Sequence, residues 1–346
     1  MTEKNRYHFL DSSRGLAAFV VLLAHTIKTF SPAIYQSSFR FIWDSEAAVL
    51  FFFILSGFVL TESIRTEKLT LPSYFNFTCK RICRIYPVFI VVLILSFLLY
   101  PFYNTPINGW LTEYWQNQPT SFDVIKQSIL ITRIPNEPAG RILPHDWTLS
   151  IEILISLALP FLAWISKRNS WLVLILTYVM VKTMPIDSFI FDFAIGVFIS
   201  SKKDYLISVW KKINFLGHSL LVIFGLIMLQ ISLLLPDFSG QIEFLMIHSK
   251  SWGISILLIA LISSIRLQSL ITNKFFILQG KISYSLYLVH FILIGILFKW
   301  HPEIDLLPAL LLVFVATFLL SAFLYNAVEK PWIQVGKKCF SGTKGQ

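Results

Sequence analysis

An arginine and a histidine, Arg14 and His25, lie eleven residues apart in the first apolar segment of the chain. At about 100° per residue, eleven steps complete about three helical turns, so both side chains would project from nearly one face, about 16 Å apart along the axis. Ionisable groups inside an apolar helix are costly and usually face a bundle interior or a polar cavity. The aligned pair therefore indicates a path for a charged, elongated ligand.

Each residue of this pair also has a plainer interpretation when it is taken alone. Arg14 fits an ordinary anchor at the cytoplasmic end of a membrane helix, and His25 fits a hydrogen-bonded packing histidine. Their alignment on one face favours function, since arginine suits phosphate and histidine suits general-base work on a hydroxyl.

A second candidate site is the basic run Lys80-Arg81-Ile82-Cys83-Arg84 before the third apolar segment. Arg81 and Arg84 are three residues apart and would share a helix face at its cytoplasmic end. Two guanidinium groups in this position suit a polyphosphate. The alternative is a juxtamembrane cluster that contacts anionic lipid.

A carboxylate and a second histidine lie within later apolar segments. Glu152 follows His145-Asp146-Trp147 and would lie about a turn and a half inside the fourth helix. It is a candidate to orient a histidine or to receive a proton, and a capping or interhelical hydrogen bond is the alternative. His290 falls within the ninth helix, where a packing role and a catalytic role are both open.

The composition places these residues in a membrane. The chain has 346 residues, of which 55% are hydrophobic and 14% charged, and its mean hydropathy is +0.69. A soluble domain has about 25% charged residues. The net charge of +10 fits basic cytoplasmic loops, and we expect no nucleic-acid partner because no soluble domain with a basic-aromatic groove is present. Three cysteines, Cys79, Cys83 and Cys339, without clustered His or Asp do not predict a metal site.

The fold class predicted is an all-α integral membrane protein, one domain over residues 1–346 with about ten transmembrane helices. Ten apolar runs could span a bilayer. They lie near 15–30, 47–63, 86–102, 148–166, 170–183, 187–201, 213–235, 251–266, 284–300 and 306–327. If the runs alternate in direction, 21 of the 29 Lys and Arg fall on one side and 8 on the other. This bias predicts that both termini are cytoplasmic.

Two connections are long. The segment 64–85 is internal and basic, whereas the loop near 103–147 is external and contains five prolines with Trp110, Tyr114 and Trp115 interleaved. Such a loop suits a binding lid or a carbohydrate-stacking surface, and an irregular cap on the bundle is an equal alternative.

The polar motifs together resemble a known family. In chain order they are Arg14 with His25, Phe53-Ile54-Leu55-Ser56-Gly57-Phe58, Arg81-x-x-Arg84 with Tyr86-Pro87, Trp147-x-Leu149-Ser150-x-Glu152, Ser283-Tyr284-Ser285-Leu286-Tyr287-Leu288-x-His290, and Glu329-Lys330-Pro331. The last of these, taken alone, is interpreted as a helix stop with an interfacial ion pair. The ordered set resembles acyltransferase family 3, the bacterial membrane O-acyltransferases of surface glycans. The chain is similar to stand-alone members that lack a fused hydrolase-like domain.

One stretch departs from the family pattern. Ile153, Leu154 and Ile155 occupy the positions where the family often has a second glutamate followed by Phe-Tyr. The resemblance therefore implies a role for Glu152 but no role for a pair of glutamates.

The resemblance implies an enzyme of the bacterial cytoplasmic membrane that takes an acyl group from cytoplasmic acyl-CoA, most often acetyl-CoA, without a metal. The acceptor implied is a hydroxyl of an outward-facing glycan, such as lipopolysaccharide O-antigen, capsule or exopolysaccharide, or of a lipid-linked sugar. The oligomeric state is left open.

These inferences combine into one mechanistic hypothesis. Arg14, Arg81 and Arg84 would hold the nucleotide and pyrophosphate of the donor. His25 would act as general base or as a transient acyl carrier, with Glu152 and His290 orienting it or relaying the proton. The alternatives are a transporter or flippase, in which the same residues form a substrate or proton pathway, and a scaffold protein.

Overall fold

The computed structural model describes residues 7–103, 110–115, 118–129, 142–184, 187–234 and 243–340. These residues form helices and connecting segments and contain no strand, which confirms the all-α class. They divide into two compact units. The first unit comprises Met1–Ala17, Asp44–Leu69 and Leu157–Ile277, and the second comprises Ala18–Trp43, Thr70–Ser156 and Leu278–Gln346.

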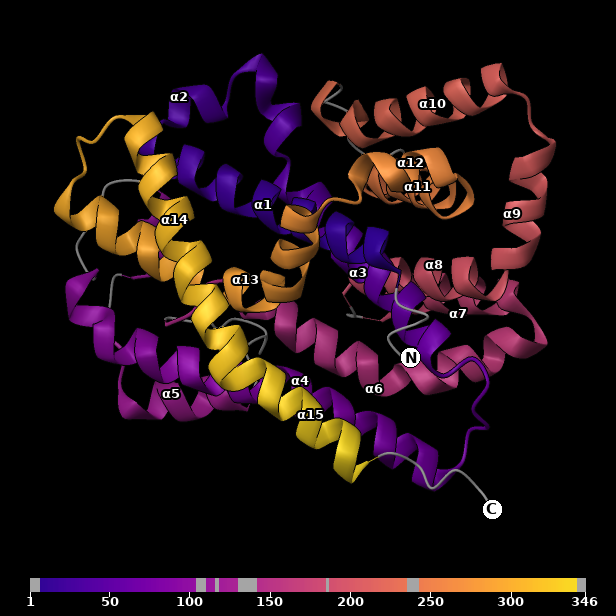
Figure 1. Cartoon of the computed structure of the whole chain (residues 1–346), viewed down its shortest axis with the longest axis horizontal. Coiled ribbons are helices and arrows are strands. Elements are labelled where there is room, and N and C mark those ends of the chain that lie inside the picture. Colours follow the sequence, from indigo (N-terminus) through magenta and orange to yellow (C-terminus); the bar gives the residue numbers. More distant parts are fainter. Residues whose placement is uncertain are drawn as a thin grey trace. The chain divides into compact units, whose positions relative to one another are not determined.

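Three long helices have residues in both units (Figure 1): α1 (His8–Phe30), α6 (Trp147–Arg168) and α13 (Lys274–Trp300). The other helices of the first unit are α3 (Ser45–Ser63), α7 (Ser170–Thr183), α8 (Phe189–Ser201), α9 (Lys203–Lys212), α10 (Phe215–Leu234), α11 (Glu243–Ser263) and α12 (Ile265–Ile271). Those of the second unit are α2 (Pro32–Tyr35), α4 (Leu71–Leu99), α5 (Ser121–Ser128), α14 (Leu306–Leu324) and α15 (Lys330–Cys339), with a 3₁₀ turn at Trp110–Glu113.

Each of the ten apolar runs falls largely within a helix. In the described part of the chain, six helical stretches are long and apolar enough to cross a membrane, and a seventh span results if α11 and α12, bent by 101°, count as one. Three further apolar helices are shorter, at 170–183, 189–201 and 215–231. The protein is therefore a multi-pass membrane protein, while ten crossings and cytoplasmic termini stay predictions.

Helix α4 begins fifteen residues before the apolar run that predicted it, so most of the expected connection 64–85 is helical. Thr70 caps the helix and forms a reciprocal capping box with Ser73, and Pro72 lies in the first turn. These are strong helix-start signals. Arg81 and Arg84 consequently lie inside α4, about three turns from its start, rather than at the end of the helix.

The interpretation of Glu329-Lys330-Pro331 as a helix stop was wrong. The chain stays helical from α14 through a π-helical turn, Tyr325–Glu329, into α15. Pro331 is tolerated because it lies in the first turn of α15, where a missing backbone N–H has little cost. Glu329, which we expected at an interface, is buried.

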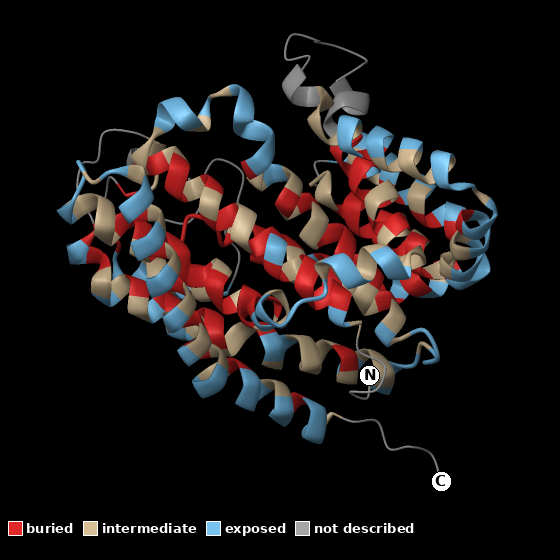
Figure 2. Ribbon diagram, turned by 45° about the horizontal axis from the view of Figure 1, so that its top comes forward, coloured by how far each residue is buried: buried red, intermediate tan, exposed pale blue. Residues whose placement is uncertain are grey.

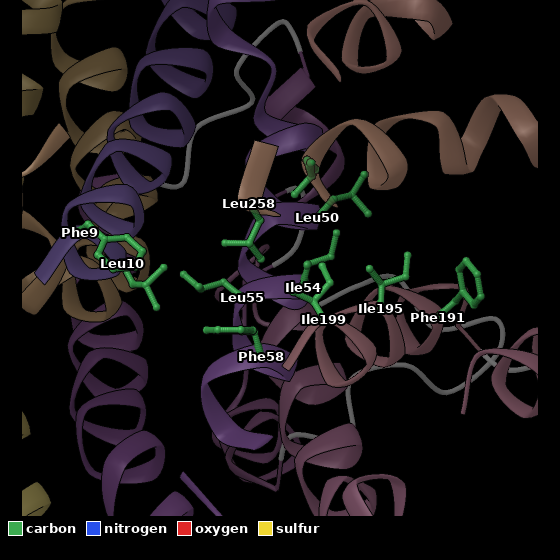
Figure 3. Close-up of a cluster of buried hydrophobic side chains, with 11 residues drawn as sticks. Phe9, Leu10, Leu50, Ile54, Leu55, Phe58, Phe191, Ile195, Ile199 and Leu258 are labelled. Carbon is green, nitrogen blue, oxygen red and sulfur yellow. The ribbon is translucent and has the colours of Figure 1, made fainter. Parts of the chain in front are cut away.

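The first unit has a core built from α3, α8 and α11, with two residues from the start of α1. Figure 2 colours the ribbon by burial, and Figure 3 shows the side chains of this cluster. Almost all of α8 is buried. Its buried members are Phe9, Leu10, Leu50, Ile54, Leu55, Phe58, Phe191, Ile195, Ile199, Ile254 and Leu258.

Two glycines allow α3 and α8 to touch. A Cβ on Gly57 would overlap the carbonyl oxygen of Phe193, and a Cβ on Gly196 would overlap that of Ile54. Small residues at such crossings let backbones approach closely in membrane proteins. The motif that contains Gly57 is thus explained by packing.

The second unit packs α15 along α4, with Gly336 against Cys83. Near the end of α1, Ala24, Ile27 and Trp43 are buried beside Leu306 and Leu310 of α14. The opposite face of α14 exposes large apolar side chains: Leu307, Leu311, Leu312, Val315, Leu319 and Phe323. An exposed apolar stripe of this kind suits contact with lipid.

We expect Gly196→Ala to destabilise the first unit by about 1–3 kcal/mol, because its methyl group would press on the backbone of α3. Gly225→Ala on α10 is the matched control, since its nearest neighbours would lie 3.3 Å from the added carbon. Thermal unfolding of the purified protein in detergent measures both. Equal melting temperatures for the two variants would contradict the close-approach explanation.

Candidate functional site

Two of the histidines singled out from the sequence meet in the second unit. Nδ1 of His25, on α1, lies 2.9 Å from Nε2 of His290, on α13. The two rings are nearly parallel, with centroids 5.2 Å apart. His290 is fully buried and His25 is partly buried.

The partners of His290 determine which nitrogen of His25 is free. Nδ1 of His290 lies 2.7 Å from the carbonyl oxygen of Tyr287, so this nitrogen must donate. In a neutral ring, Nε2 of His290 then accepts the proton of His25 Nδ1–H. This order of donors leaves a lone pair on Nε2 of His25, which is the requirement for a general base.

A third histidine, His145, completes a cluster that the sequence did not single out. Its ring centroid lies 5.1 Å from that of His290, and its ring stacks on Phe291 at 4.8 Å. Phe291 also contacts the rings of His25 and His290, each at 4.7 Å. His145 stands just before α6, in a segment that we treated as the end of the external loop, and its position next to Asp146-Trp147 was the available signal.

Part of the loop near 103–147 lies against this histidine cluster. The ring of Trp110 lies 5.5 Å from that of His25, and its Nε1 donates to Oγ1 of Thr29 at 3.3 Å. Lys28 lies over the same indole at 4.2 Å. The loop therefore presents an aromatic surface next to His25. Three stretches of this loop, at 104–109, 116–117 and 130–141, with Pro106, Pro135 and Pro138, lie outside the described residues.

Asp146 is buried beside the cluster residue His145. It is 0% exposed, and neither carboxylate oxygen has a hydrogen-bond partner in the described part of the chain. Burial raises the pKa of Asp146 well above its usual range. Burial, with His290 and His25 as neighbours, lowers the pKa of His145 well below its usual range. Both effects favour the neutral forms.

The other carboxylate, Glu152, pairs with an arginine. Its Oε1 forms an ion pair with Nη2 of Arg81 across α6 and α4, and the two side chains are 24% and 12% exposed. Nε of Arg81 is buried without a hydrogen-bond partner in the described part. Within the same part, Glu152 makes no hydrogen bond or ion pair with His25 or His290, and Arg84 is exposed.

Polar residues of the α13 motif connect neighbouring helices of the second unit. The Tyr284 hydroxyl donates to the carbonyl oxygen of Ile85 on α4, and Oγ of Ser285 donates to Glu329 at 2.7 Å. The Tyr287 hydroxyl lies 2.8 Å from Oγ1 of Thr148 on α6. The motif is therefore a set of interhelical hydrogen bonds that holds the helix of His290 in place.

Arg14 lies on the same uninterrupted helix as His25, as the spacing predicted. It belongs to the first unit, and its Nη1 is 3.7 Å from the carboxylate of Asp11, one turn earlier. Asp11 is buried, so the arginine is oriented by a neighbour on its own helix.

A family model described as an acyltransferase domain matches residues 7–326. The chain belongs to acyltransferase family 3. An O-acetyl transferase of Shigella phage Sf6 is similar to it, with 26% identity over 181 residues, which are 49% of this chain and 50% of the phage protein. The chain thus spans about half the length of the curated relative that it matches. No solved structure matches the chain.

Among the described residues, no group of three or more His, Cys, Asp or Glu side chains has an arrangement that would hold a metal ion. The three histidines are arranged around Phe291, with stacked and tilted rings.

The lowered pKa of His145 predicts a pH-dependent stability. The folded protein keeps this imidazole neutral, whereas the unfolded chain protonates it below about pH 6.5, so the folded state loses stability as the pH falls. We expect His145→Gln to flatten the decline in unfolding free energy between about pH 6.5 and 5.5, by up to about 1.4 kcal/mol per pH unit.

Denaturant unfolding in neutral detergent at several pH values measures this slope. His301→Gln, at an exposed position after α13, is the control and should keep the slope of the unmodified protein. An unchanged slope in His145→Gln would show that this ring is not held neutral by its surroundings.

Proposed function

We propose that this acyltransferase family 3 protein moves an acyl group, in the first instance acetyl, from cytoplasmic acyl-CoA to a hydroxyl of a glycan outside the bacterial cytoplasmic membrane. The observation that supports this proposal most directly is the chain of hydrogen bonds from His25 through His290 to the carbonyl of Tyr287. This order of hydrogen bonds leaves the lone pair of His25 Nε2 free of His290 and available to a substrate.

In the proposed step, His25 Nε2 takes the proton of the acceptor hydroxyl as its oxygen attacks the thioester carbonyl carbon. The new C–O bond forms, the C–S bond breaks, and the leaving thiolate takes the proton from the imidazolium. His290 is a positioning residue, because it sets the tautomer of His25 and does not need to contact substrate.

Three arginines are proposed to hold the phosphates of the donor: Arg14 on α1, and Arg81 and Arg84 on α4. Guanidinium groups suit phosphate because their paired donors match two oxygens. Glu152 is proposed to act through Arg81, which it holds by the ion pair. In this role Glu152 is a positioning residue rather than a proton carrier.

The acceptor is proposed to approach His25 beside Trp110. Aromatic rings offer sugars a flat apolar surface, and Trp110 lies in the loop that the charge bias places outside. The phage relative is named an O-acetyl transferase, which supports a hydroxyl as acceptor. The glycan proposed is lipopolysaccharide O-antigen, capsule, exopolysaccharide or a lipid-linked sugar.

The first test is mass spectrometry of surface glycans from cells that express the protein, His25→Ala or Arg14→Ala at matched levels. We expect an acyl ester with the unmodified protein and at least about a 100-fold loss with His25→Ala, as for removal of a general base. Arg14→Ala should lose transfer and also weaken binding of coenzyme A by the purified protein.

His8→Ala is the matched control, since it removes an exposed imidazole from the same helix. Full ester formation by a folded His25→Ala protein would exclude its catalytic role. If the unmodified protein does not bind coenzyme A, the result would favour a transporter instead.

The positioning role of His290 predicts a graded series. We expect His290→Leu to lower kcat by at least about tenfold with little change in KM, because the tautomer of His25 is no longer set. His290→Gln should recover much of kcat, since an amide can accept from His25 and donate to the Tyr287 carbonyl.

Transfer kinetics on a purified acceptor measure this split. Equal activity of the Leu and Gln variants at equal stability would show that the hydrogen-bond order around His290 does not matter.

A further inference from the structure

A polar cavity of about 440 Å³ lies within the first unit, and none of the residues assigned to acyl transfer lines it. It is formed where the last turns of α3, α6 and α8 meet the first turn of α7. In Figure 1, α7 and α8 lie next to each other in this unit, in agreement with their packing. The volume suits a small polar group or a lipid headgroup.

The lining of this cavity is strongly basic. Four basic residues line it, namely Arg65, Lys167, Arg168 and Lys202, and no carboxylate does. These residues come from three segments that are separate in the sequence. The charge bias of the sequence assigns all three to the cytoplasmic side.

Most of these cations are not neutralised by carboxylates. Arg65 pairs with Asp204 at 2.7 Å. The Lys167 ammonium donates to a backbone carbonyl, and the Arg168 guanidinium lies 4.0 Å over the ring of Trp164. Lys202 makes no side-chain hydrogen bond or ion pair within the described residues. The cavity therefore has surplus positive charge.

The first turn of α7 adds hydrogen-bond donors to the same wall. Asn169 caps this helix, and its Oδ1 accepts from the backbone N–H of Trp171 at 3.0 Å. Ser170, the next residue, lines the cavity and is 3% exposed, yet its Oγ has no hydrogen-bond partner in the described part. A buried hydroxyl without a partner is uncommon and points to a missing ligand. A helix N-terminus attracts anions.

We propose that this cavity binds a phosphate group at the cytoplasmic surface of the membrane. Arg168 and Lys202 would supply charge, and Ser170 would donate its hydroxyl proton to a phosphate oxygen. The same chemistry is offered by the headgroup of an anionic lipid and by a free nucleotide. The site is independent of the acyl-transfer residues.

Native mass spectrometry of the purified full-length protein in neutral detergent tests the proposal. Three probes are used separately: phosphatidylglycerol, diacylglycerol as a lipid without phosphate, and coenzyme A. We expect the double variant Arg168→Gln/Lys202→Gln to bind the phosphate-bearing probe about tenfold or more weakly. The control Lys211→Gln/Lys212→Gln, which removes the same charge from exposed positions on α9, should bind as the unmodified protein does.

Ser170→Ala is a second variant, which removes a hydroxyl without changing charge and leaves helix α7 capped. We expect it to weaken binding about threefold to tenfold. If the cavity variants lose binding of phosphatidylglycerol, the cavity is a lipid site. If they lose binding of coenzyme A, it is a nucleotide site. Coenzyme A binding that is lost only with Arg14→Ala reports the acyl-donor site instead.

Two results would overturn the proposal. One is equal binding of both phosphate-bearing probes by the folded cavity variants and by the control. The other is binding of diacylglycerol as tight as that of phosphatidylglycerol. Melting temperatures of all variants establish that each protein is folded.

Discussion

The cost of an ionisable group in an apolar helix bundle is the constraint on which the rest of this structure depends. Buried or half-buried groups here are matched with partners: Arg81 with Glu152, Lys203 with Glu62, and His290 with the carbonyl of Tyr287 among others. Where a partner is missing, as at Asp146, burial favours the neutral form. His25 and His290 obey the same constraint, because their neutral rings can satisfy each other and the carbonyl of Tyr287 only in one order of donors.

Close packing is the second requirement, because lipid offers little hydrophobic drive for helices to associate. Gly57 and Gly196 let the backbones of α3 and α8 touch. The missing side chain of Gly295 leaves room for the ring of Trp115. Motif residues therefore divide into two kinds. The small ones bring helices together, and polar ones such as Ser285 then join them by hydrogen bonds.

Local signals in the sequence predicted most helices, because the apolar runs are long and nearly continuous. The start of α4 was missed since polar and basic residues interrupt the apolar ones over its first fifteen residues, although the capping box at Thr70 marks it. The turn at Glu329 was misread as a stop because proline breaks an α-helix in general, whereas here a π-helical turn precedes Pro331, which lies in the first turn of α15. His25 was predicted from its spacing to Arg14 in an apolar segment, and His290 from its place in a motif within another apolar segment.

By itself the sequence determined that the protein is helical, lies in a membrane and belongs to an acyltransferase family, because hydrophobicity and ordered motifs are local properties of the chain. Only the tertiary structure decided which polar groups face one another. It placed His145 beside His290, directed Glu152 to Arg81, and left Ser170 in a basic cavity. These pairs join residues far apart in the chain, and their contacts depend on how helices rotate and pack, which residue spacing within one helix does not specify.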